Sequence, residues 1–281
     1  MKSAFLALAT LLMFAHAAAA EGIERIASAG GDITEILFEL GLGEKVVAVD
    51  STSIYPESVR DLPSVGYVRE LSAEGVLATG ADLLIGSHDM GPPAVMDNLA
   101  AAGMRVEFAP DSRGAERFVD KVAFVSGIVG EDARGEELIA LYQEKIAELK
   151  VRKSKMERAP KALLILAVRD GAPIAAGIET TGNDMIVLAG GENVATYEGW
   201  KPMSAEAVIA AAPEIIFLSS AHIERMGGID AVMELPSIKA TPAGQNGSYL
   251  ELNAQMMLQF GPRSPIAMGD MMSAFEAILA D

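Results

Sequence analysis

The sequence predicts an α/β protein of two similar lobes with mostly parallel sheets, joined by a long helix. The first observation is an internal repeat: Leu71–Ala78 and Met203–Ala210 read LSAEGVLA and MSAEAVIA, at an offset of 132 residues. Each copy precedes a short apolar stretch that ends in serine, Asp82–Ser87 and Glu214–Ser219, at the same offset. The second observation is that short apolar strands alternate with helical patterns of about ten residues, which is typical of parallel sheets covered by helices.

In the first half, the pattern predicts strands at 24–28, 45–49, 83–85 and 105–108 and helices at 32–40, 73–78 and 93–102. Asp32 is expected to cap the first helix, because its carboxylate can accept free backbone N–H groups, and Glu35 completes a capping box. Ser72 is expected to cap the helix that carries the first repeat.

Two consecutive helices interrupt this alternation. Residues 116–129 are predicted to form the first, Gly130 ends it, and residues 132–155 form the second. About 24 helical residues span about 36 Å, and they lie between the two repeats, so we expect a rigid connection with little hinge motion. Strand–helix alternation resumes at 162–168. The expected organisation is a signal peptide at 1–20, an N-terminal lobe at 21–115, a helical connection at 116–158 and a C-terminal lobe at 159–281.

The N-terminus has the pattern of a secretory signal peptide. Lys2 precedes an apolar run at 4–14 and the alanine tract 17–20, which give a positive region, a short apolar region and a small-residue cleavage site. The run is shorter than the roughly 20 residues of a membrane span. There is no cysteine, which excludes disulfides, thiolate metal sites and a lipidated N-terminal cysteine. We therefore expect a free periplasmic monomer that is not embedded in the membrane.

Composition excludes several classes of function. The formal net charge is −17 and the pI is about 4.6, which argues against nucleic acid, because phosphate binding needs a basic face. The acidity also fits a simple role in solubility. The chain contains no Gly-x-Ser-x-Gly, Walker or His-Glu-x-x-His motif. A binding protein is therefore favoured over an exported α/β enzyme.

Several segments carry a family resemblance. Val65–Leu77, which reads VGYVRELSAEGVL, resembles the haem-ligand segment of periplasmic haem-binding proteins of bacterial ABC importers. Further similar segments are Gly91–Pro93, Leu188–Asn193, Trp200–Glu206, Thr241–Gly244 and Phe260–Arg263. The resemblance covers nearly the whole mature chain, although the Ser-x-Glu repeat is shared with cobalamin and siderophore binders. It implies two Rossmann-like lobes joined by one long helix. The implied role is to carry ferric haem b to a dimeric membrane permease and its ATPase.

Tyr67 is the expected axial ligand of the haem iron. A neutral phenol binds metals poorly, but ferric iron is a hard cation that favours an anionic oxygen. In an extended loop, Arg69 would lie on the same side as Tyr67 and could donate to the phenolate oxygen. This contact would also weaken the iron bond, which suits a carrier that must release its cargo. The other interpretation is a loop tyrosine packed over the next helix, with Arg69 on the surface.

Trp200 has the matching place in the second lobe, since the pairs Gly66-Tyr67 and Gly199-Trp200 precede the two repeats. The indole fits two roles, stacking on a porphyrin face or anchoring the core. Tyrosine is common at this place in the family, so the role of Trp200 stays open. Candidate anchors for the haem propionates are Arg69, Arg169, Asn183 and Lys201.

Two histidines are candidates for a second iron ligand. His88 and His222 follow predicted strands, so we expect both at strand carboxyl ends, where open α/β sheets bind ligands. Five-coordinate haem on Tyr67 alone is the simpler expectation, and one or two haems are both compatible with the sequence. A bare metal site would need several converging histidines. A ferric siderophore, bound by a basic group of Arg69, Arg169, Lys201 and Arg263, or cobalamin remains the alternative ligand.

The repeat also places one glutamate at an equivalent position in each copy. Glu74 and Glu206 lie in the first turn of their predicted helices, where a carboxylate favours the positive helix end. The duplication suggests a second role, because two carboxylates can meet two basic pockets on a two-fold permease. The resemblance implies the same role, docking to the permease through one glutamate per lobe.

Overall fold

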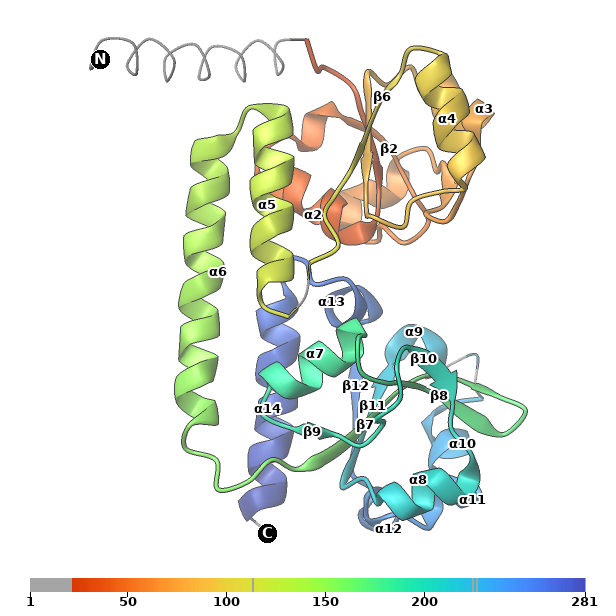
Figure 1. Ribbon diagram of the computed structural model, residues 1–281, viewed down its shortest axis with the longest axis vertical. Coiled ribbons are helices and arrows are strands. Elements are labelled where there is room, and N and C mark those ends of the chain that lie inside the picture. Colours follow the sequence, from red (N-terminus) through yellow and green to blue (C-terminus); the bar gives the residue numbers. More distant parts are fainter. Residues whose placement is uncertain (1–21, 113, 224, 226, 281) are drawn as a thin grey trace, which may run out of the picture. The chain divides into compact units, whose positions relative to one another are not determined.

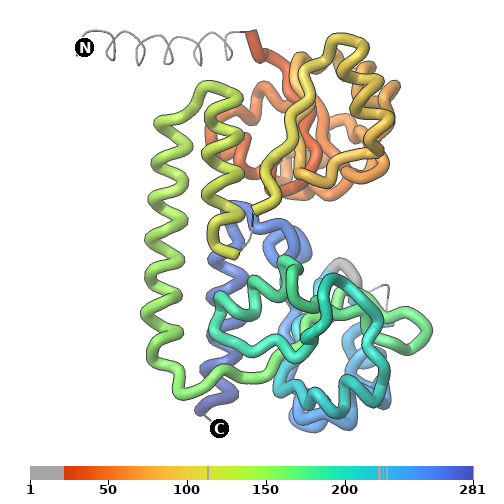
Figure 2. Tube along the Cα trace, in the orientation of Figure 1, coloured from red at the N-terminus to blue at the C-terminus, as the bar shows by residue number. Residues whose placement is uncertain are grey.

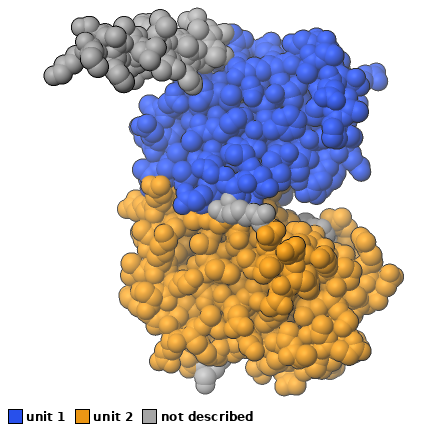
Figure 3. Space-filling model, viewed as in Figure 1, with its two compact units in different colours: residues 1–112, 116–141 blue, residues 113–115, 142–281 orange. Residues whose placement is uncertain are grey.

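The computed structural model describes residues 22–112, 114–223, 225 and 227–280. The expected signal peptide lies outside the described residues. The chain divides into two compact units: Met1–Ser112 with Glu116–Leu141 form unit 1, and Arg113–Ala115 with Tyr142–Asp281 form unit 2 (Figure 3). The long helix α6 (Asp132–Lys153) begins in unit 1 and ends in unit 2, close to the predicted bounds. Within the described ranges, no helix has the length and apolar character that a membrane crossing requires.

Unit 1 is built on a parallel sheet, as predicted. The strands are β1 (Ile26–Ala29), β2 (Val46–Val49), β5 (Leu83–Gly86) and β6 (Arg105–Phe108), in the order β2-β1-β5-β6. All residues of β1 and β5 are buried, which is typical of parallel strands covered on both faces. Because all four strands are parallel, their carboxyl ends meet at one edge of the sheet.

Helices cover this sheet (Figure 1). They are α2 (Gly31–Glu39), α3 (Ala73–Ala78), α4 (Pro93–Ala101) and α5 (Glu116–Val129), with 3-10 turns η1 (Gly43–Lys45) and η2 (Glu57–Asp61). Helix α2 packs against β1 and α5, whereas α3 packs against α4, which also contacts β6. A two-stranded hairpin, β3 (Gly66–Tyr67) and β4 (Glu70–Leu71), lies outside the sheet.

The predicted cap of α2 is wrong. The N-cap is Gly30, at a φ of 114° that favours glycine, and no side chain caps the helix. Asp32 is instead buried in the first turn and pairs with Lys121 of α5. The sequence pattern gave no sign of this pair, because the two residues lie 89 positions apart.

Unit 2 contains a mixed sheet in the order β10-β8-β7-β11-β12, with β9 also paired to β7. Its strands are β7 (Lys161–Arg169), β8 (Ala172–Ala176), β9 (Glu192–Asn193), β10 (Trp200–Pro202), β11 (Ile215–Ser219) and β12 (Tyr249–Leu252). Strands β7, β11 and β12 are parallel, whereas β8 pairs antiparallel with both β7 and β10. The hairpin of β7 and β8 therefore replaces part of the expected strand–helix alternation.

The helices of unit 2 are mostly short. They are α7 (Thr181–Leu188), α8 (Ala205–Ala211), α9 (Ser220–Ile223), α10 (Ile229–Met233), α11 (Pro236–Lys239), α12 (Pro242–Asn246), α13 (Ala254–Leu258) and α14 (Ser264–Ala280). Helix α14 lies beside α7, as the chain trace shows (Figure 2). Phe275 of α14 meets Phe217 of β11 edge to face at 5.4 Å, with both rings fully buried.

The internal repeat is present in the fold. Helices α3 and α8 are each capped by a serine, Ser72 and Ser204, whose hydroxyl accepts the backbone N–H of the residue three positions on. Strands β5 and β11 follow at the same offset of 132 residues. The two units therefore share one structural plan around these elements, as the sequence predicted.

Candidate ligand-binding site

Tyr67 lies in a hairpin at the carboxyl edge of the unit 1 sheet. It pairs with Glu70, and the two residues between them form the turn. Val68, in the turn, is buried in the core, whereas Tyr67 is 39% exposed. Backbone hydrogen bonds attach the hairpin to its neighbours, from Ser51 N to Gly66 O and from Leu71 N to Gly91 O, both at 2.8 Å, and from Gly91 N to Val68 O at 2.9 Å. Tyr67 is therefore presented outward from a fixed backbone.

Arg69 donates to the phenol oxygen of Tyr67, as the sequence predicted, but by a different route. The distance from Arg69 Nη1 to Tyr67 Oη is 2.8 Å. Arg69 reaches Tyr67 across a two-residue hairpin turn, not along an extended loop. The guanidinium also lies 5.9 Å from the centre of the Tyr67 ring.

A carboxylate that sequence reasoning missed holds Arg69 in place. Asp89 accepts from Arg69 Nε at 2.6 Å, and its other oxygen accepts from the Ser87 hydroxyl at 2.7 Å. Burial opposes the charged form of Asp89, but the hydrogen bonds from Ser87 and Arg69 outweigh it and lower the pKa of Asp89. Burial likewise tends to lower the pKa of Arg69, yet the hydrogen bond and charge of Asp89 raise it overall. Both groups are therefore charged at neutral pH.

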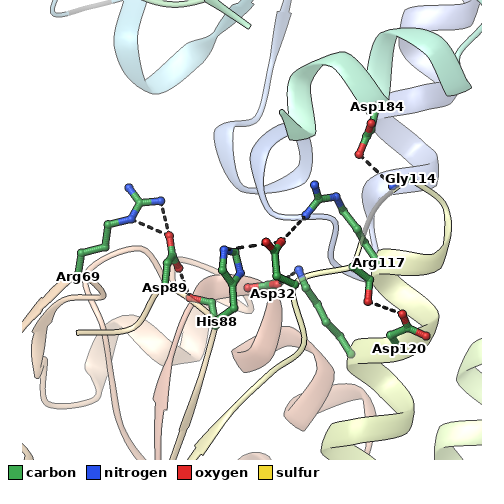
Figure 4. A network of polar contacts seen from close by, with 12 residues as sticks. Asp32, Arg69, His88, Asp89, Gly114, Arg117, Asp120 and Asp184 are labelled. Atoms are coloured by element: carbon green, nitrogen blue, oxygen red, sulfur yellow. Dashed lines mark hydrogen bonds and ion pairs between the residues drawn. The ribbon is translucent and has the colours of Figure 1, made fainter. Parts of the chain in front are cut away.

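His88 continues this line of polar contacts at the same sheet edge (Figure 4). Its Nε2 lies 3.7 Å from Asp111 Oδ1, and the same oxygen lies 3.5 Å from Nη1 of the buried Arg117 on α5. His88 is half exposed and follows β5, as predicted. The sequence analysis did not predict a site role for Asp111 or Arg117. The only signal was their position: Asp111 follows β6 and Arg117 lies at the start of α5, both at the carboxyl edge of the sheet.

Buried Asp50 organises the loop that leads to the hairpin. Its carboxylate accepts from the backbone of Gly30 and Thr52, both at 2.9 Å, and from the Ser53 hydroxyl at 2.7 Å. Asp50 follows β2, so it joins the ends of β1 and β2 at the edge that carries Tyr67. A buried carboxylate group whose oxygens accept several hydrogen bonds is a stable anchor for such a loop.

In unit 2, Trp200 begins strand β10 and pairs with Ala176. Like Gly66 before Tyr67, Gly199 has a positive φ, a backbone conformation that favours glycine. The indole is partly buried and lies close over Gly182 of α7, where an added Cβ would come within 3.1 Å of the ring. Trp200 is thus packed on one side and open on another.

The predicted propionate anchors differ in their surroundings. Arg169 and Lys201 are exposed, at the end of β7 and within β10. Asn183 lies in the first turn of α7, and its side-chain oxygen accepts from Asn193 Nδ2 at 3.1 Å. Asn193 also donates to the Ala176 carbonyl, so this amide pair fixes α7 to the sheet.

His222 falls in α9, immediately after β11 as predicted, but its side chain lies outside the described part of the structure. Across the described ranges, no three histidine, cysteine or acidic side chains form a group that could hold a metal ion.

Glu74 and Glu206 are both exposed in the first turns of α3 and α8. The backbone N–H of Glu206 and the Ser204 hydroxyl donate to the Glu206 carboxylate and lower its pKa. This is the behaviour of a carboxylate at a helix N-terminus.

Comparisons with known proteins identify the family. Residues 26–256 match the profile of a family described as periplasmic binding protein. The chain belongs to the periplasmic binding protein family. The resemblance drawn from the sequence is confirmed by solved structures. The periplasmic heme-binding protein RhuT from Roseiflexus sp. RS-1 is 36% identical with a TM-score of 0.88, over 92% of this chain and 100% of that one.

Two further relatives differ in the ligand that their names give. The periplasmic heme-binding protein BhuT, solved with two hemes, is 30% identical with a TM-score of 0.87, over 91% of this chain and 98% of that one. A vitamin B12-binding protein of Vibrio vulnificus (strain YJ016) is 24% identical over 272 residues, which cover 95% of this chain and 96% of the relative. Proteins of this family are substrate-binding proteins, not enzymes, and they work with ABC transporters.

Proposed function

We propose that the protein binds ferric haem in the periplasm and carries it to the permease and ATPase of an ABC importer. One observation carries this proposal: Tyr67 is 39% exposed, and its oxygen receives a hydrogen bond from Arg69, which Asp89 holds in place. In this role Tyr67 is the axial iron ligand. The solved haem-binding relatives, at 30% and 36% identity, support it.

The chemistry of the hairpin suits a ligand that must also be released. A phenol oxygen has two lone pairs, so it can accept from Arg69 and still bind iron. The guanidinium donates to this oxygen, and hard ferric iron favours an anionic phenolate as its ligand. The same hydrogen bond draws electron density from the oxygen and weakens its bond to iron. The Tyr67 oxygen therefore contributes both to the binding of haem and to its release.

Other residues complete the proposed haem contacts. The open side of the Trp200 indole offers a stacking surface. Arg169 and Lys201 provide exposed cations for the propionates, and Asn183 can contribute its amide nitrogen, since its oxygen accepts from Asn193. His88 is the candidate sixth ligand near Tyr67, with Asp111 beside it.

Cobalamin is the second candidate ligand, because several relatives across most of the chain are named vitamin B12-binding proteins. The two ligands make different demands on Tyr67. If the ligand is ferric haem, Tyr67 binds the iron as its axial ligand. If the ligand is cobalamin, there is no iron, and Tyr67 can act only as an ordinary contact residue. The test is therefore centred on this side chain.

For delivery, we assign Glu74 and Glu206 as the carboxylates that dock to the permease. Both are exposed at equivalent positions of α3 and α8. An ABC permease is built on a two-fold axis, so two like carboxylates suit two like basic sites.

A hemin titration of the mature protein, followed by visible absorbance, tests the ligand. Wild type should give a saturable high-spin ferric spectrum with a tyrosinate charge-transfer band, and Tyr67→Phe should lose that band. Tyr249→Phe is the matched control, because Tyr249 is similarly exposed, at 41%, and lies in unit 2. A low-spin spectrum lost in His88→Ala would instead make His88 a ligand. Saturable binding of cyanocobalamin, with no hemin binding above background, would refute the haem assignment.

A further inference from the structure

The two repeat helices carry a second pair of exposed residues that neither the core nor the caps explain. Leu77 and Ile209 occupy equivalent positions at the offset of 132, and they are 45% and 43% exposed. Other shared positions have structural roles: Ser72 and Ser204 cap, whereas the valines one position before Leu77 and Ile209 are buried. Because both copies of the repeat expose a large aliphatic side chain at the same position, we look for a role that the two copies share.

Each aliphatic side chain lies one turn after the glutamate of its helix. Residues three apart in a helix are neighbours on one face, with Cβ atoms about 5–6 Å apart. Glu74 with Leu77, and Glu206 with Ile209, therefore form an acidic–apolar pair on an outward face. The buried valines, Val76 and Val208, pack into the cores and hold each helix in place.

In unit 1, Leu77 borders a shallow hollow. The hollow has a volume of about 310 Å³, and it is lined by Leu77, Ala81, Asp82, Ala102, Gly103 and Met104. The lining joins the aliphatic side chain of Leu77 to the carboxylate of Asp82, so polar and apolar groups meet beside this helix.

We propose, resting on the proposed role in delivery, that Leu77 and Ile209 form the apolar half of a two-part docking motif. The partner is the importer's permease, each subunit of which presents a basic side chain beside an apolar one. Apolar contact at the centre of an interface excludes water, and an ion pair that is shielded from water is stronger than an exposed one. The motif therefore adds affinity that the glutamates alone do not supply.

Charge favours the permease over a second copy of this chain as the partner of the motif. The protein has a formal net charge of −17, and each motif contains a carboxylate. Two copies facing through these motifs would bring like charges together, which is unfavourable. A permease with basic sites is complementary to the same surface.

The test measures binding of the mature protein, with and without hemin, to the reconstituted permease–ATPase complex of its importer. Leu77→Gln and Ile209→Gln should each weaken binding about tenfold, or about 1.4 kcal/mol. Both should leave the hemin titration unchanged. Leu141→Gln and Ile266→Gln are matched controls, because these residues are also exposed, at 58% and 49%, on α6 and α14. The controls should bind the importer like wild type.

Salt dependence distinguishes the two halves of the motif. Glu74→Gln should flatten the dependence of affinity on salt, whereas Leu77→Gln should lower affinity and keep the slope, because exposed charges are screened and apolar contacts are not. Importer binding by Leu77→Gln and Ile209→Gln that matches wild type would overturn the proposal while haem delivery stands. If the wild type binds no hemin but these two variants still lose importer binding, the docking motif holds and the ligand assignment fails. Absence of any wild-type binding to the importer would overturn the motif.

Discussion

Replacing Asp32 by alanine should destabilise unit 1 strongly, because it removes the carboxylate that faces Lys121. The two side chains are only 3% and 8% exposed, so neither charge is well solvated by water. Breaking a buried pair by deleting one partner costs about 3–5 kcal/mol, because the remaining buried group loses an interaction that offset its removal from water. We expect the free energy of unfolding of unit 1 to fall by about this amount.

Urea titration measures this change. Far-UV circular dichroism follows the whole chain, whereas the fluorescence of Trp200, the only tryptophan, reports unit 2. Comparing the two probes assigns the loss of stability to unit 1. With a urea slope of about 2 kcal/mol/M, a loss of about 3–5 kcal/mol moves the midpoint of unit 1 down by about 1.5–2.5 M.

Two controls make the test specific. Glu276→Ala removes an ion pair with Arg152 whose side chains are 43% and 37% exposed, and it should cost less than about 1 kcal/mol. Replacing both buried partners, Asp32→Leu with Lys121→Met, should recover much of the stability, because neither buried charge remains. A loss below about 1 kcal/mol in Asp32→Ala would refute the argument that this pair is sheltered from water.

Three further outcomes follow from the structure. The lowered pKa of Asp89 means that its ionised form stabilises the fold above its usual pKa of about 3.9, and that this contribution is lost as pH falls through the lower folded value. The difference in unfolding free energy between wild type and Asp89→Asn should thus shrink in acid titrations. Ser204→Ala removes the cap of α8 and should cost about 1 kcal/mol in urea unfolding, whereas an unchanged midpoint would contradict the capping role. Phe275→Ala should cost about 3–5 kcal/mol in the Trp200 transition, because a fully buried ring in edge contact with Phe217 leaves a cavity.

Local patterns predicted most of the first half of the fold. The sheet strands and α-helices of unit 1 end within a few residues of the expected bounds, and β6 and α5 match them fully, whereas the β3–β4 hairpin was expected to be an extended loop. The serine caps of α3 and α8 were readable because a cap depends on residues only three apart. In unit 2, the β7–β8 hairpin was missed, because Asp170-Gly171 allows a tight turn that the apolar pattern alone does not reveal.

Long-range contacts explain what the sequence could not predict. Asp32 was expected to cap its own helix, yet its partner is Lys121, 89 residues away. The contact of Arg69 with Tyr67 could be predicted, because they are neighbours, but the contact with Asp89 joins two separate loops. The position of Asp89 directly after β5 was the one available signal, since strand carboxyl ends meet at this edge.

The charges around Tyr67 give the proposed haem site a preference for oxidation state. Asp89 and Arg69 neutralise each other, so a Tyr67 side chain that binds iron as a phenolate would add one net negative charge to the hairpin. The core of ferric haem, an iron(III) in a doubly deprotonated porphyrin, carries one positive charge, whereas the ferrous core is neutral. The phenolate therefore favours ferric over ferrous haem, as hard-ligand chemistry also requires. After reduction with dithionite, the haem-loaded protein should transfer haem to an apo-globin acceptor faster than the oxidised haem-loaded protein does. Equal release rates in the two states would contradict iron–phenolate bonding.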